Sequence, residues 1–375
     1  MKALHVLLAV VLVGCSGGST GLASPTPPTF LEVETPSPSA TPAPLMNGLP
    51  TTFAPCAGAA KTVKRAAYNC LRDWKPKMEK YPGKVVYHFS PSITASEKAA
   101  IREATEFALV RAEGYINTAG FATEFHLFYN MDDWEACEAL LKSWPGTADV
   151  DWLYAGDFAL CSPNGFGGNG IGSLLPGTTA AAISTPRSHE NFWEGTFAYY
   201  TYRVLPHEVV SAMPYASRLG PVALNVAPRW IMYAASRAPW QAAGIELLGD
   251  SLEDYHDDVI PQPGAATWQP TVSDARFGPW PEDLQSLMSE TPWFYAVVDL
   301  ASQYMTAMFG PDWIQKTLFP IMIKEDTGVD TINAFRREAD RVAQRIWGGR
   351  WSDLESAVDE YMITEFRAAG ITGLD

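Results

Sequence analysis

The stretch His207-Glu208-Val209-Val210-Ser211 decides the fold prediction for this chain. In the zinc motif HExxH, two histidines one helical turn apart bind one Zn²⁺, and the glutamate activates the bound water. The first histidine and the glutamate are present here, but Ser211 stands at the position of the second histidine. The stretch therefore predicts either an enzyme with substitute metal ligands or a related fold that has lost its metal.

The neighbouring residues place this stretch on a long helix. We predict a helix over 192–216, which Pro206 should kink or restart directly before His207. A second pair, His189-Glu190, also lacks a histidine at the fifth position, so the dipeptide alone carries little weight. His207 and Glu208 differ from that pair because the segment Pro228-Arg229-Trp230 and a run of predicted helices follow them.

The rest of the chain divides into an αβ half and a helical half. A capping box formed by Thr94 and Glu97 predicts the start of a long helix that ends at about Thr118. A glycine-rich stretch, 165–172, is interpreted as a flexible loop or hairpin connection. Hydrophobic periodicity predicts further helices over 59–78, 229–237, 293–309, 312–324, 330–346 and 351–369, and strands over 85–89, 124–129, 152–160 and 179–183. This order predicts an α+β fold, with a small N-terminal mixed sheet and helices followed by a mostly helical C-terminal subdomain.

This layout resembles the gluzincin branch of zinc metallopeptidases, especially small bacterial peptidase MA-like lipoproteins. In that family a strand–helix–strand unit precedes the HExxH helix, and the stretches 85–89, 94–118 and 125–129 are similar to it. The segment Pro228-Arg-Trp-Ile-Met-Tyr-Ala234 falls where the family has Pro-x-Trp-x-x-Glu-Gly. Predicted helices over 295–309, 331–335 and 351–361 are similar to its C-terminal helices. The resemblance covers residues 84–366 and implies a thermolysin-like fold.

The same resemblance identifies what has changed at the metal site. If the protein is active, it implies that His207 is a zinc ligand and Glu208 the catalytic base. Ser211 and Tyr233 replace the other two expected ligands. A catalytic zinc site needs three protein ligands and a water, so we expect no cofactor, with zinc bound only if other residues rebuild the site. Candidates for that role are Glu246, His256 and the acids of 250–258.

The N-terminus has the features of a bacterial lipoprotein. Residues 1–14 are predicted to be a signal peptide, and Leu12-Val13-Gly14-Cys15 matches a lipobox in which Cys15 is acylated. A tether rich in Pro, Ser and Thr follows over 15–52. We therefore expect a membrane anchor through the lipid at Cys15 and an extracytoplasmic place in the cell envelope. Residues 53–190 form the predicted α/β subdomain and 191–375 the helical subdomain.

Four further cysteines, Cys56, Cys70, Cys137 and Cys161, predict disulfides in an exported protein. Three pairings are possible, and short loops favour Cys56–Cys70 with Cys137–Cys161. The net charge of −15 argues against nucleic acid as a partner. His88 and His126, each within a predicted strand, are interpreted as structural residues rather than metal ligands.

These observations lead to three functional hypotheses. The first is a catalytically inactive pseudopeptidase in the envelope that binds peptide or protein. The second is an active zinc metallopeptidase with unusual ligands, in which Glu208 acts as the base. The third is a non-enzymatic structural or carbohydrate-binding envelope module, for which the 13 Trp and 15 Tyr could line a groove.

Overall fold

A computed structural model describes most of the predicted globular part. The described residues are 52–76, 78–111, 124–129, 167–172, 178–184, 196–216, 229–257, 292–313 and 332–370, with a few positions between 135 and 143. The predicted lipidation site Cys15, the tether, Cys137 and Cys161 lie outside them, as do the predicted strand 152–160 and most of the predicted helix 312–324. The described chain is mixed and mostly helical with one small sheet, which confirms the α+β class.

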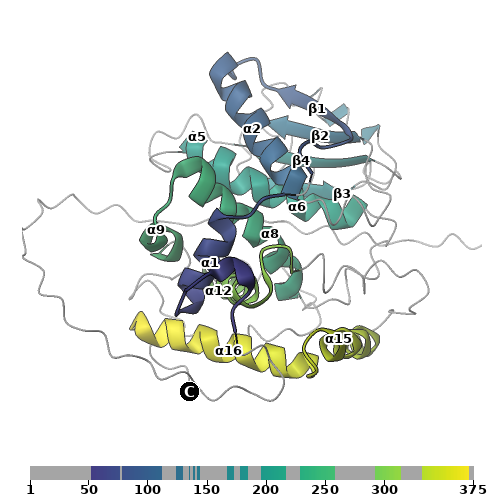
Figure 1. Cartoon of the computed structure of the whole chain (residues 1–375). Coiled ribbons are helices and arrows are strands. Elements are labelled where there is room, and N and C mark those ends of the chain that lie inside the picture. Colours follow the sequence, from purple (N-terminus) through teal and green to yellow (C-terminus); the bar gives the residue numbers. More distant parts are fainter. Residues whose placement is uncertain are drawn as a thin grey trace, which may run out of the picture.

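The sheet has four strands in the order β1-β2-β4-β3. They are β1 (Lys84–Phe89), β2 (Glu124–Tyr129), β3 (Gly167–Gly172) and β4 (Thr178–Ser184). β2 pairs in parallel with both β1 and β4, and β3 pairs antiparallel with β4. Helix α2 (Ala95–Arg111) follows β1 after the predicted capping box, in which Thr94 N–H donates to Glu97 Oε2 at 2.7 Å. Figure 1 shows the sheet at one end of the molecule, with helices below it.

One face of the sheet is buried against the helices. Phe125, Leu127 and Tyr129 of β2 point to this face and are fully buried together with Ile101 and Ala104 of α2. Side chains alternate along a strand, so the opposite face carries Glu124, His126 and Phe128. The Tyr129 hydroxyl lies 2.7 Å from Thr201 Oγ1, which ties the buried face to the helical segment that contains Thr201.

Residues 167–172 of the glycine-rich stretch form a strand, and not the flexible loop or hairpin connection that was predicted. β3 pairs with β4 over its whole length, with Gly168 opposite Ile183 and Gly170 opposite Ala181. The register puts Gly168, Gly170 and Gly172 on the buried face. Because glycine adds no side chain there, α6 (Leu205–Ala216) approaches to within 8 Å between Cα atoms of both β3 and β4.

The predicted helix over 192–216 is a continuous helical segment with a wider turn in it. It consists of α5 (Thr196–Tyr199), a π-helical turn η3 (Tyr200–Val204) and α6. Leu205 N–H donates to the Tyr200 carbonyl five residues earlier, directly before Pro206. Proline lacks the N–H of a regular helix and its ring crowds the preceding turn, so the chain widens at this point and continues as α6.

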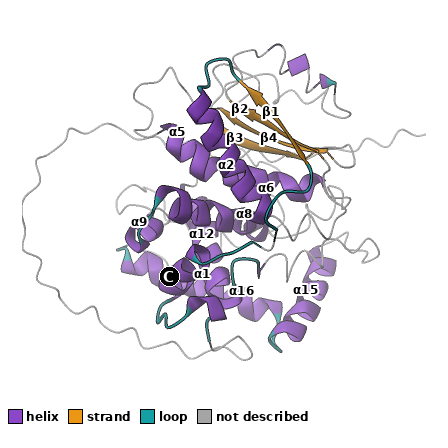
Figure 2. Ribbon diagram, turned by 45° about the horizontal axis from the view of Figure 1, so that its top comes forward, coloured by secondary structure: helices purple, strands orange, loops and turns teal. Residues whose placement is uncertain are grey.

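Two long helices pass below α6. Helix α8 (Arg229–Ala243) continues through Pro239 and ends in a second π-helical turn, η4 (Gly244–Leu248). The sequence predicted its end at Arg237, so the helix is longer than expected. Helix α12 (Pro292–Phe309) packs against α8. Figure 2 shows these helices crossing beneath the sheet, with the short α9 (Leu252–Asp257) at one side.

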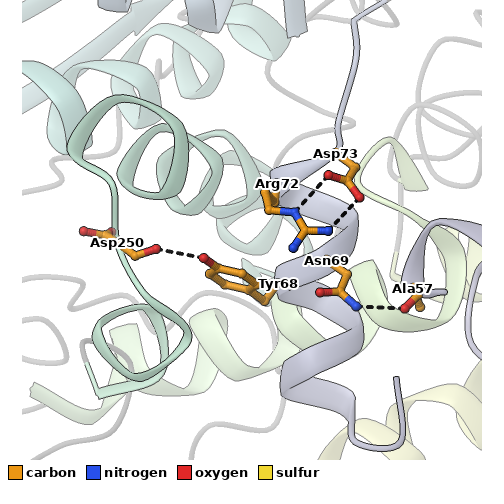
Figure 3. Close-up of polar contacts among 6 residues, drawn as sticks. All are labelled: Ala57, Tyr68, Asn69, Arg72, Asp73 and Asp250. Carbon is orange, nitrogen blue, oxygen red and sulfur yellow. Dashed lines mark hydrogen bonds and ion pairs between the residues drawn. The ribbon is translucent and has the colours of Figure 1, made fainter. Parts of the chain in front are cut away.

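Helix α1 (Val63–Arg72) packs on α12 and is held by contacts on two sides. It is shorter than the predicted 59–78. The Tyr68 hydroxyl donates to the Asp250 carbonyl at 3.0 Å, and Asn69 Nδ2 donates to the Ala57 carbonyl at 2.9 Å (Figure 3). A disulfide joins Cys56, in the short turn η1 (Pro55–Ala57), to Cys70. The favoured Cys56–Cys70 pairing is therefore confirmed.

The last two helices close the molecule opposite the sheet (Figure 1). They are α15 (Ile332–Ile346) and α16 (Trp351–Ala368), and α16 packs on α12, where the Tyr361 hydroxyl donates to Gln303 Oε1 at 2.9 Å. Their bounds agree closely with the predicted 330–346 and 351–369. Within the described residues, no helix combines the length and apolar character needed to cross a bilayer.

Candidate functional site

His207 and Glu208 lie in the first turn of α6, directly after the π-helical turn and Pro206. Both residues have an exposed fraction of 0%. The helix that carries them packs against α8 on one side and against β3 and β4 on another. The chain therefore positions the pair in the interior, at the junction of the sheet and the helical layer.

Two side chains of α8 define the surroundings of His207. The His207 ring meets the Trp240 ring edge to face, with centroids 5.7 Å apart and an interplanar angle of 88°. The Arg237 guanidinium lies 3.8 Å from the centroid of the same Trp240 ring. Arg237 and His207 thus share Trp240 as a common neighbour, and a fixed positive charge lies beside the imidazole.

This environment favours the neutral form of His207. Burial lowers the pKa of His207 well below its ordinary value of 6.5, and the positive charge of Arg237 acts in the same direction. A backbone contact with Ser236 acts in the opposite direction but is the smallest of these effects. His207 is therefore an uncharged interior imidazole at neutral pH.

Arg237 is held in place by a carboxylate from the neighbouring helix. Its Nε and Nη2 atoms each lie 2.6 Å from an oxygen of Asp299 on α12, and both side chains are about 5% exposed or less. Gln241 Nε2 donates to Asp299 Oδ1 at 3.3 Å and supports the same carboxylate. The bidentate pair joins α8 to α12 and fixes the guanidinium next to His207.

The described residues around His207 do not fit a zinc ion. Zn²⁺ needs several neutral or anionic ligands at one point, whereas the charge that lowers the pKa of His207 is that of the cationic Arg237. Arg237 follows Tyr233 by four residues, so it lies on the same side of α8 as the position where the family resemblance places a glutamate ligand. The side chains of Ser211 and Tyr233 lie outside the described residues.

Three of the proposed substitute ligands are engaged elsewhere. Glu246 forms an ion pair with Arg111 at 2.7 Å, and His256 lies 3.2 Å from Glu365. Asp250 is paired with Arg203 at 2.6 Å. In the part of the chain that the structure describes, no group of three or more His, Cys, Asp or Glu side chains could hold a metal ion.

Sequence reasoning found His207 and Glu208 but missed Arg237 and Asp299. Their separation of 62 residues gives no pattern within one element. The available signal was Asp299, the one charged residue of the predicted helix 293–309, because charged residues are rarely buried unless they are paired. Chemically, the arrangement is an interior polar cluster with one fixed ion pair. No family model, curated protein or solved structure matches this chain.

Proposed function

We propose that this chain is a lipid-anchored protein of the bacterial cell envelope, with a gluzincin-like fold that binds peptide or protein without hydrolysing it. The observation that carries the proposal is the fixed guanidinium of Arg237 beside His207. A second cation at this point would be repelled, and the burial of Glu208 separates its carboxylate from bulk water. Loss of catalysis with retention of the surrounding fold is the simplest account of these two facts.

The order and packing of the elements support the family resemblance. A β1–α2–β2 unit precedes the helix that carries His207 and Glu208, as the resemblance implies. The antiparallel strand β3 lies beside that helix, and a set of helices follows. These features support a gluzincin-like arrangement in which α6 occupies the place of the HExxH helix.

The sheet edge supports peptide or protein as the ligand. β3 is the last strand in the sheet order, and no further strand pairs with it among the described residues. The free edge of a strand can accept an extended peptide as an additional strand through main-chain hydrogen bonds. Such binding needs neither a metal nor a catalytic base.

Metal analysis tests the loss of catalysis. We would purify the full chain in detergent without chelator, together with His207→Ala, and measure zinc by mass spectrometry. We expect no stoichiometric zinc in either protein. Close to one zinc per chain, lost in His207→Ala, would overturn the proposal in favour of an active metallopeptidase. A Glu208→Gln variant would then test for the loss of proteolysis.

Hydrogen exchange tests the peptide ligand. Peptides from a tryptic digest of an unfolded protein would be added to the full chain, and exchange would be followed by mass spectrometry. We expect slower exchange in residues 167–172, with residues 332–346 of α15 unchanged as an internal control. Unchanged exchange in β3 at saturating peptide concentration would contradict peptide binding at this edge.

The lipid anchor has its own test. Growth of expressing bacteria with labelled palmitate should label the wild-type chain, and Cys15→Ser should remain unlabelled and leave the membrane fraction. Labelling of Cys15→Ser at the wild-type level would place the lipid elsewhere.

A further inference from the structure

Three titratable side chains form a hydrogen-bonded chain on the face of the sheet opposite the buried core. His126 Nε2 lies 2.9 Å from Glu124 Oε1, and His126 Nδ1 lies 3.0 Å from His88 Nε2. Glu124 and His126 come from β2, and His88 comes from β1. These hydrogen-bonded side chains therefore link one strand to its parallel neighbour, in addition to the main-chain hydrogen bonds between the two strands.

The direction of each hydrogen bond follows from the carboxylate. Burial alone would raise the pKa of Glu124, but Lys84 at 3.4 Å and His126 hold it below its ordinary value. Glu124 is therefore ionised at neutral pH and can only accept, so His126 Nε2 must carry the proton. A neutral His126 then has a lone pair on Nδ1, and His88 must donate to it through Nε2–H.

We propose that Glu124, His126 and His88 form an acid-sensitive clasp between β1 and β2, closed when both imidazoles are neutral and opened when both are protonated. In the closed state, each imidazole has one proton and both hydrogen bonds are made. A first added proton binds His88 Nδ1 and leaves both bonds intact. A second proton must bind His126 Nδ1, which removes the acceptor and sets two positive rings side by side.

On the described strands, Glu124 is the one anionic side chain on the face that carries the clasp. Lys84 is the other charged group on this face of β1, and it pairs with Glu124. On β4, the positions opposite Glu124, His126 and Phe128 are Thr178, Ala180 and Ala182, and none of these side chains titrates. Glu124 is thus the single counter-charge on these strands for two imidazolium rings.

Packing also favours the closed, neutral state. The His88 ring stacks on the buried Phe128 ring with centroids 4.4 Å apart and an interplanar angle of 11°. Burial lowers the pKa of both histidines, and the charge of His126 acts in the same direction on His88. For His126, the Glu124 carboxylate acts in the opposite direction without outweighing burial. β1 is the end strand among the described strands, so opening the clasp would loosen the outer strand of that sheet rather than its centre.

Hydrogen exchange as a function of pH tests the clasp. We would measure the amide exchange rates of the full chain in detergent at pH 7.5 and pH 5, and correct each rate for the intrinsic effect of pH on exchange. We expect exchange in residues 84–89 to accelerate in acid, by at most about thirtyfold for each histidine, because pH 5 lies about 1.5 units below the ordinary histidine pKa of about 6.5. His88→Phe, which keeps the ring stacked on Phe128, should lose this acceleration. His256→Gln, which removes a different histidine–carboxylate contact, should keep it.

A measurement on the wild-type chain keeps the proposal falsifiable if His88→Phe does not fold. Long-range ¹H–¹⁵N spectra of histidine-labelled protein at pH 7.5 should show His126 protonated at Nε2 and unprotonated at Nδ1. The opposite tautomer of His126 would overturn the clasp, because Nδ1 could not then accept from His88. Equal acid acceleration in wild type and a folded His88→Phe would also overturn it.

Discussion

The ion pair between Arg237 and Asp299 gives the sharpest test of the interior that surrounds His207. Both side chains are about 5% exposed or less, and two 2.6 Å contacts join them. Asp299→Asn keeps the shape of the side chain but leaves the guanidinium buried without its counter-charge. Breaking a buried pair in this way typically costs about 3–5 kcal/mol of unfolding free energy. Arg237→Met should cost a similar amount, because it leaves the Asp299 carboxylate buried with only the weaker bond from Gln241.

Removing both charges should restore most of this loss. A fully neutral replacement of a buried pair is often neutral or stabilising, so Arg237→Met with Asp299→Asn should lie within about 2 kcal/mol of wild type. The two single costs and the double cost then imply a coupling energy of at least about 4 kcal/mol. This coupling energy is large because both charged side chains are buried, so a charge left by a single substitution is not solvated by bulk water.

The assay is urea unfolding of the four proteins, followed by intrinsic tryptophan fluorescence. We expect the midpoints of the single variants to fall while the slope of free energy against urea stays constant. Single costs below about 1 kcal/mol, or single costs that simply add in the double variant, would refute the reasoning. Either result would mean that water or another group solvates the pair in solution.

Three further predictions concern the helices and the disulfide. Cys56→Ser with Cys70→Ser should lower the unfolding free energy by about 3 kcal/mol, since the bridge closes a loop with a sequence separation of 14; identical urea midpoints with and without the bridge would argue otherwise. Burial lowers the pKa of His207, so in acid the unfolded chain binds a proton at this residue that the folded chain does not, and the unfolding free energy should fall as the pH drops below 6.5. The melting temperature of His207→Phe should therefore decrease less than that of wild type between pH 7.5 and 5. An equal decrease in both proteins would show that His207 does not cause the acid sensitivity. Leu205→Ala, at a fully buried position, should cost about 2–5 kcal/mol, whereas Leu248→Ala, at a residue that is 38% exposed, should stay within about 0.5 kcal/mol in the same urea assay.

Local signals predicted much of the secondary structure. The Thr94–Glu97 capping box marked the start of α2 because its hydrogen bonds involve only residues three apart in the chain. The bounds of α15 and α16 followed from apolar periodicity. Pro206 was correctly expected to disturb its helix, although its effect is a π-helical turn and not a break.

Long-range packing decided the features that the sequence left open. β3 contains four glycines among six residues, a composition typical of loops, and it becomes a strand because β4 pairs with it and α6 packs closely against it. Helix α8 continues past Pro239 although a proline there removes a helical hydrogen bond. The contacts between His88 and His126 depend on the register of two parallel strands, which no local pattern specifies.

The disulfide near the start of the described chain also affects how the protein would bear a mechanical load. A pull applied through Phe53 would reach Cys56 and pass through the sulfur atoms directly to Cys70. The residues between these cysteines would carry none of the tension, so the pull could not unfold α1 starting from its first turn. The hydrogen bond from Ala54 N–H to the Ala307 carbonyl, at 2.8 Å, lies upstream of the bridge and would yield before it.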